Sequence, residues 1–238
     1  MLPRYCLFII VLLIFDEIKC QKSFSKESII EFSGFLWHKK EQYSKVGPGP
    51  NYFGLHKNNV IIDKKGRLHL KVKRHKGAWS CAEISTDSIL KEGKYEVSFY
   101  CSRAKMPSNL VLGLFLYDKK NAPSYNEVDF ELSKWNKAES MNAQYVVYND
   151  TSLCVKRFDL SFLKQETKLT FLINSDSITV SSSWLDDRRL IYKSTFVRPT
   201  TFEPRQLRFR MNLWLIDSVT NRLNPFDVII TSFDYTEL

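Results

Sequence analysis

Glycine and proline are scarce in this chain, and several common catalytic and metal-binding motifs are missing. The 238 residues include 8 Gly and 8 Pro, which excludes a collagen-like or low-complexity chain, and no segment repeats at a fixed period. No CxxC pair or group of histidines indicates a zinc site, and no GxSxG motif indicates a serine hydrolase. Sustained helical periodicity is absent beyond the N-terminal segment. These absences exclude fibrous and repeat proteins and remove the commonest signals of zinc and serine chemistry.

The composition is that of a folded protein with a basic surface. Hydrophobic residues make up 44% and aromatic residues 14% of the chain, enough for a large core and too much for a disordered chain. The length suits one domain, and we expect a monomer. The formal net charge is +9, but the cations are scattered and no nucleic-acid motif accompanies them. We therefore expect no nucleic-acid partner, and an acidic glycan remains one candidate ligand. The one loose basic cluster is Lys71, Lys73, Arg74 and Lys76.

The N-terminus has the form of a secretory signal. Arg4 precedes an apolar run, Tyr5–Phe15, that is too short for a comfortable transmembrane helix. We expect a signal peptide over residues 1–20, with an uncleaved anchor as the alternative. The protein is then secreted or held at the cell surface or in the periplasm, with a membrane contact only if the segment is retained. Residues 21–31 form a short lead-in. Three cysteines follow it, and whether they pair or stay reduced is open.

Short strand-like runs separated by turn residues recur through the rest of the chain. This spacing predicts an all-β fold of two packed antiparallel sheets. Leu110–Asp118 is nearly all apolar, which predicts a central strand covered on both faces. The other main runs are Arg67–Arg74, Ser80–Thr86, Gly93–Cys101, Tyr125–Leu132, Met141–Asn149, Lys168–Ser175, Ser177–Trp184, Leu207–Ile216 and Val228–Leu238.

Acids occupy every second position of Tyr125–Leu132, and apolar residues fill the gaps. A strand of this pattern carries Glu127, Asp129 and Glu131 on one face, with Tyr125 beside them. Crowding like charges on a sheet face costs stability. The two Glu residues, about 13 Å apart at Cα, can bring their carboxyls to the roughly 5–5.5 Å that a retaining glycosidase needs. The central Asp can hold a proton between them. The alternatives are a solvated acidic edge and a calcium site.

Polar side chains of one parity occur on other predicted strands. Amides hydrogen-bond sugar hydroxyls, and aromatic rings stack on pyranose faces. Beside a strand of three carboxylates, such residues indicate a polysaccharide cleft. They are the pairs Glu83 and Ser85, Asn142 and Gln144, and Asn212 and Trp214.

These motifs together resemble glycoside hydrolase family 16, which contains laminarinases, lichenases and agarases. NEVDFE, residues 126–131, matches the family's E-[IVL]-D-x-E catalytic strand. Weaker similarities follow in the family's order, at residues 80–100, 142–147, 210–214 and 232–238. The resemblance covers residues 32–238. It implies a concanavalin A-like β-jelly-roll sandwich of two antiparallel sheets with a concave substrate cleft.

The resemblance also implies a retaining, endo-acting glycoside hydrolase. Glu127 would be the nucleophile, Asp129 its helper and Glu131 the general acid and base. No cofactor is implied and no metal ligand is assigned, although a structural calcium ion remains open. The substrate-binding positions would be Asn51, Tyr52, Glu83, Tyr125, Trp135, Asn142, Gln144, Asn212 and Trp214.

The chain departs from the family at two places. Residues 166–180 lack the His and Trp of the His-x-Tyr-x-x-x-Trp segment that many members carry, and Tyr125 stands where glucanases often have Trp. Specificity for β-glucan therefore does not carry over. The alternatives are a transglycosylase, which uses the same intermediate, and a non-catalytic, lectin-like module on the same sandwich.

Overall fold

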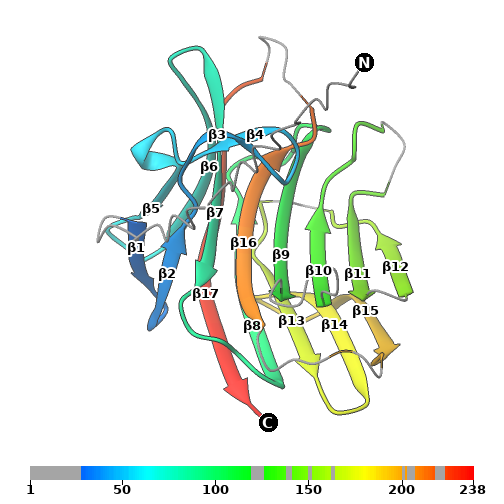
Figure 1. The fold of residues 1–238 in the computed structure, drawn as a ribbon. Coiled ribbons are helices and arrows are strands. Elements are labelled where there is room, and N and C mark those ends of the chain that lie inside the picture. Colours follow the sequence, from blue (N-terminus) through cyan, green and yellow to red (C-terminus); the bar gives the residue numbers. More distant parts are fainter. Residues whose placement is uncertain are drawn as a thin grey trace, which may run out of the picture.

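The computed structural model describes residues 28–118, 126–137, 141–149, 152–161, 164–199, 202, 207–217 and 223–238. It consists almost entirely of β-strands (Figure 1), so the expectation of an all-β fold is confirmed. The expected signal segment, most of the lead-in and Tyr125 lie outside the described residues. Within those residues, no helix has the length and apolar character needed to cross a bilayer.

One antiparallel sheet, which we call the cleft sheet, carries the acidic strand β10 near its middle. Antiparallel pairing runs without a break from β1 to β12. The strands in spatial order are β1 (Ile29–Phe32), β2 (Phe35–Lys39), β7 (Ala78–Thr86), β16 (Arg208–Leu215), β9 (Leu110–Asp118), β10 (Asn126–Leu132), β11 (Ala143–Asn149) and β12 (Ser152–Phe158).

A second antiparallel sheet, the back sheet, packs behind the first (Figure 1). Short elements connect the two: β4 pairs in parallel with the start of β7, which also pairs with β6. The connecting elements are β3 (Gln42–Val46), β4 (Asn51–Phe53) and the 3₁₀ turn η2 (Lys57–Asn59). The back sheet's strands in spatial order are β5 (Val60–Ile62), β6 (Leu68–His75), β17 (Phe226–Glu237), β8 (Gly93–Cys101), β13 (Thr167–Ile173), β14 (Ser177–Trp184) and β15 (Leu190–Val197).

The core lies between the two sheets and is rich in aromatic side chains. Burial alternates strictly along β13 and β14, as expected for strands with one face inward. Phe130 of the acidic strand is fully buried, and its ring centroid lies 5.7 Å from that of Phe99 on the back sheet. Phe209 similarly lies 4.9 Å from Phe233. The apolar half of the acidic strand therefore anchors it, and its acids face away from the core.

The prediction that β9 is covered on both faces is wrong for its second half, although Val111 on the outer face is fully buried. Leu112, Leu114 and Leu116 are fully buried in the core. The intervening Phe115 and Tyr117 line a cleft on the outer face of the cleft sheet. Continuous hydrophobicity did not distinguish burial from an aromatic cleft floor, because both place large apolar side chains on the second face.

The described cysteines are all free thiols. Cys81 lies on β7 and Cys101 on β8, so the two occupy different sheets, and both are buried. Burial raises the pKa of each thiol to about 12. They therefore act as small apolar core residues.

Candidate active site

The register of the cleft sheet brings residues from five strands into one row. Residues directly opposite each other on antiparallel strands share a face. A mostly polar row therefore crosses the sheet, with Gly113 at its centre and Glu131 next to it. In order it runs from Gln144 on β11 through Glu131 on β10, Gly113 on β9 and Asn212 on β16 to Glu83 on β7.

The other two acids of β10 lie in adjacent rows on the same face. Asp129 is opposite Phe115, which is opposite Arg210, and Glu127 is opposite Tyr117. The three acids line a cleft of about 690 Å³. Its walls also include Glu83, Asn212 and Trp214, as well as Lys40, Gln42, Pro48, Phe115, Tyr117 and Arg210.

Asp129 is the most buried of the three acids. Its side chain forms a hydrogen bond with Glu127, and the residue is 8% exposed. Burial, together with the charges of Glu127 and Glu131, raises the pKa of Asp129 well above its ordinary value. This shift favours the protonated form of Asp129, which can share a hydrogen bond with the Glu127 carboxylate.

Glu127 has conflicting influences on its ionisation. Its pKa is raised to about 7, mainly by burial and also by the charge of Glu131. The hydrogen bond from Asp129 and the charge of Arg210 both act against this rise. A carboxyl with such a pKa can be ionised near neutral pH while remaining poorly solvated. That combination suits a nucleophile more than a surface acid.

Glu131 is supported from the opposite side by β11 and β12. Burial raises its pKa, whereas a hydrogen bond from Gln144 and the charge of Arg157 lower it. The Gln144 amide nitrogen donates to Glu131 Oε2, and Arg157 Nε donates to Gln144 Oε1 over 3.1 Å. The Arg157 guanidinium also lies 5.2 Å from the centre of the Trp135 ring. Glu131 is thus held through Oε2 by a chain of contacts from β11 and β12.

Glu83 forms the core of a buried ion cluster at the other end of the row. Its Oε1 accepts from Arg210 over 3.2 Å and its Oε2 accepts from Lys40 over 2.9 Å. Lys40 also donates to the carbonyl of Gly47 over 2.6 Å, which ties the loop carrying Pro48 to the cleft wall. Both oxygens of Glu83 are thus paired to cations. Arg210 and Lys40 line the cleft beside Glu83.

Asn51 and Tyr52 follow the loop of Gly47 and Pro48 and are not among the described residues that line the cleft. The Asn51 side chain is buried and donates to the carbonyls of Pro48 over 2.8 Å and Leu215 over 2.7 Å, so it fixes the loop to β16. Tyr52 is half-buried, with Lys45 Nζ 5.9 Å from its ring centre. Their assignment to sugar contact stays a prediction.

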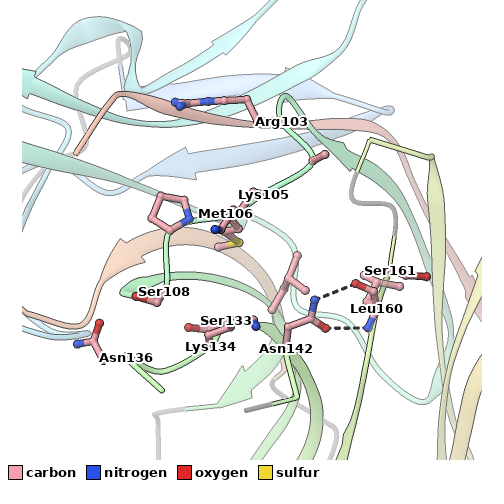
Figure 2. A pocket seen from close by; sticks show the side chains of 13 residues that line it. Arg103, Lys105, Met106, Ser108, Ser133, Lys134, Asn136, Asn142, Leu160 and Ser161 are labelled. Carbon is pink, nitrogen blue, oxygen red and sulfur yellow. Dashed lines mark hydrogen bonds between the residues drawn. The ribbon is translucent and has the colours of Figure 1, made fainter. Parts of the chain in front are cut away.

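Asn142 lines a different pocket, of about 850 Å³, at the end of β10 (Figure 2). Its side chain forms two hydrogen bonds with the Leu160 backbone, at 2.7 Å and 2.8 Å, drawn in Figure 2. Met106, Ser133 and Lys134 contribute to the same pocket. Asn142 therefore shapes the loop after β12, and its assignment to the sugar cleft stays a prediction.

Sequence reasoning missed several cleft residues. Arg210 lies two positions before Asn212, so strand parity alone could have identified it. Arg157 and Tyr117 become visible only once strand register is known. Lys40 follows the end of β2 and had no recognisable signal.

No set of three or more His, Cys, Asp or Glu side chains within the described ranges is arranged to hold a metal ion. Glu127 and Asp129 instead share a hydrogen bond, and Glu131 accepts one from Gln144. These contacts are the ones expected of groups that share and exchange protons.

The fold is similar to that of several solved glucanase structures. A β-glucanase of Bacillus licheniformis shares 18% identity over 89% of this chain and 97% of its own, with a TM-score of 0.64. A β-1,3-1,4-glucanase (lichenase) from a mouse hindgut metagenome shares 15% identity over 89% and 97%, with a TM-score of 0.63. A protein of Mycobacterium tuberculosis described as a pseudo β-1,3-glucanase shares 10% identity over 85% and 91%, with a TM-score of 0.66.

No protein-family model matches the sequence, and no curated protein matches it either. The solved structures nevertheless show that this chain has the jelly-roll fold of the family 16 glucanases, as the motif resemblance predicted.

Proposed function

We propose that this protein is a divergent member of glycoside hydrolase family 16 and that it cleaves a polysaccharide internally with retention of configuration. The observation that carries the proposal is the placement of Glu127, Asp129 and Glu131 on one strand face inside a cleft. The cleft spans neighbouring strands and contains amide and aromatic side chains, which fits an extended glycan.

In the first step, the Glu127 carboxylate attacks the anomeric carbon as the glycosidic bond breaks. Glu131 donates its proton to the departing oxygen, so the leaving sugar takes a neutral hydroxyl. The proton held by Asp129 stabilises Glu127 by hydrogen bonding without leaving the site. The product is a covalent glycosyl-enzyme ester.

In the second step, Glu131, now ionised, removes a proton from water as the water oxygen attacks the same carbon. The ester bond breaks and Glu127 regains its charge. Gln144 and Arg157 hold Glu131 in place through both steps. The chemistry requires no cofactor. The N-terminal segment fits export to a site where polysaccharide is accessible.

A panel of β-1,3-linked, mixed-linkage, galactan and acidic polysaccharides tests this proposal through the release of reducing ends. We expect release from at least one substrate by the wild type and a loss of at least about 10³-fold in Glu127→Gln, because that variant lacks the nucleophile. Glu237→Gln is the matched control, since this acid lies on β17 of the back sheet and pairs with Lys91.

Three outcomes distinguish the alternatives. Equal release by wild type and Glu127→Gln contradicts the proposed mechanism. Binding to a glycan with no release by the wild type indicates a lectin-like module. New chain lengths longer than the substrate, formed without a matching rise in reducing ends, indicate a transglycosylase.

A further inference from the structure

Arg210 is the cation on the nucleophile side of the acidic strand. It lies on β16, across β9 from Asp129, and contacts two neighbours that fix its guanidinium. One is Glu83, to which it donates over 3.2 Å. The other is Tyr117, whose ring centre lies 5.3 Å from the guanidinium carbon. Tyr117 is also directly opposite Glu127, so the second contact places the guanidinium beside the cross-strand partner of Glu127, and Arg210 and Glu127 line the same cleft.

Other cations near the cleft are engaged elsewhere. Lys40 donates to Glu83 and to the Gly47 carbonyl. Arg157 donates to Gln144 on the Glu131 side. Arg208 donates to the backbone carbonyls of Thr86 and Asp87. Arg210 is likewise paired with Glu83, but it also packs on Tyr117, the cross-strand partner of Glu127, which makes it the candidate cation for Glu127 among the described residues.

We propose that Arg210, anchored by Glu83, is a positioning residue that keeps Glu127 ionised and in place for attack. This inference rests on the proposed function, because it assigns Arg210 a role in the same reaction. Arg210 contacts neighbouring side chains, so its effect on the reaction would pass through Glu127.

The charged and titratable groups around Glu127 support this assignment. On the same strand as Glu127, Asp129 stabilises the charged form of Glu127 by a hydrogen bond, and Glu131 destabilises that form by repulsion. Burial opposes the charged form most strongly, and Arg210 favours it. The titratable and charged groups facing Glu127 from the packed elements are Tyr117 on β9, Tyr148 on β11, Arg208 and Arg210 on β16, and, farther along the cleft, Glu83 on β7 and Lys40.

Glu83 gives Arg210 its fixed position. Its side chain is only 6% exposed, and buried ion pairs with good geometry resist rearrangement because breaking them leaves an uncompensated charge. Within the Lys40–Glu83–Arg210 cluster, Lys40 also binds the Gly47 carbonyl of the loop, and Arg210 also packs on Tyr117 beside the acidic strand. Glu83 is the fourth acid of the cleft, and it lies at the far end of the row from Glu131.

The first test compares Arg210→Met with Arg210→Lys in the pH profile of kcat/KM. Without the cation, Glu127 ionises at higher pH, so the acid limb of Arg210→Met should move upward by about one pH unit, which means about a tenfold loss below the limb. Arg210→Lys should restore part of the shift. Arg189→Met, which removes an exposed cation from the back-sheet side, should leave the profile unchanged.

The second test is independent of turnover. At low pH Glu127 is protonated in both the wild type and Arg210→Met. At high pH Glu127 is ionised in both, but in Arg210→Met no guanidinium stabilises its charge. The variant should therefore lose stability between about pH 5 and pH 8, as measured by thermal unfolding. In a Glu127→Gln background this pH-dependent part of the loss should disappear.

The two tests separate the failures. If the wild type releases no product from any glycan, the proposed function fails, while the unfolding cycle still reports on the Arg210–Glu127 interaction. An unchanged acid limb in an active Arg210→Met, or a pH-dependent loss that is undiminished in the Glu127→Gln background, overturns the role of Arg210.

Discussion

Replacing Glu127 by glutamine should stabilise the protein at alkaline pH while removing its activity. The carboxylate sits in a cleft where burial and the charge of Glu131 disfavour its ionised form. Glutamine has nearly the same shape and no charge, and its amide oxygen can still accept the hydrogen bond from Asp129. The substitution therefore removes the cost of a buried charge while keeping the local packing.

The size of the effect follows from the pKa of Glu127. A rise from the ordinary 4.5 to about 7 corresponds to about 3.4 kcal/mol of lost stability once the group is ionised. Because Glu127 shares protons with its neighbours, we expect a gain of about 2–3 kcal/mol. For a protein of this length, that is a rise in melting temperature of roughly 4–12 °C.

The sign depends on pH. A carboxyl whose pKa is raised by folding lowers stability above its folded pKa and has no such effect below its unfolded value. The gain in Glu127→Gln should thus be full near pH 8 and absent near pH 4, with the change centred between the two pKa values of about 4.5 and about 7.

Thermal unfolding of wild type, Glu127→Gln and the exposed control Glu237→Gln across this pH range provides the assay. The control should change by less than about 0.5 kcal/mol, as exposed ion pairs usually do. A gain of equal size at both ends of the range, or none at alkaline pH, would refute the assignment of Glu127 as a buried, poorly solvated carboxylate.

Three further substitutions test other parts of the site. Gln144→Leu removes a hydrogen-bond donor from Glu131 and so raises its pKa; the alkaline limb of kcat/KM should move to higher pH, with kcat lowered about tenfold or more. Gly113→Ala should destabilise the fold by about 1–3 kcal/mol in urea unfolding, because its new Cβ would lie 2.5 Å from Asn212 Oδ1; a neutral result would contradict this close approach. Asn51→Ala should cost about 1–3 kcal/mol through two lost hydrogen bonds to backbone carbonyls; a large rise in KM with unchanged stability would instead assign it to sugar binding.

The acidic strand could be predicted from sequence because its two faces differ so sharply. Alternation with period 2 identified both the strand and the face that carries Glu127, Asp129 and Glu131. The core face followed from the same pattern, and Phe130 is indeed fully buried. Local periodicity is sufficient where one face is charged and the other is apolar.

Contacts across strands could not be predicted in the same way. The pairing of Gln144 with Glu131 depends on the register between two consecutive strands, and that of Arg210 with Glu83 on the register between strands far apart in the chain. Register is fixed by the whole sheet and not by any one segment. For the same reason the sequence did not separate Asn142, which bonds the Leu160 backbone, from the residues that face the cleft.

The cleft floor shows a second limit. Phe115 and Tyr117 belong to a run that is apolar on both faces, and apolar side chains serve equally well in a core and under a sugar ring. Only the position of β9 beside β10 and β16 distinguishes the two uses.

Trapping the covalent intermediate tests the central claim most directly. A slowly turned-over substrate, fluorinated at C2 of the sugar that the polysaccharide panel identifies, should leave a glycosyl group on the enzyme. Mass spectrometry should then show one added glycosyl unit on the peptide that contains Glu127, and no adduct in Glu127→Gln. Product formation with inverted configuration and no adduct, or an adduct on another residue, would contradict the account.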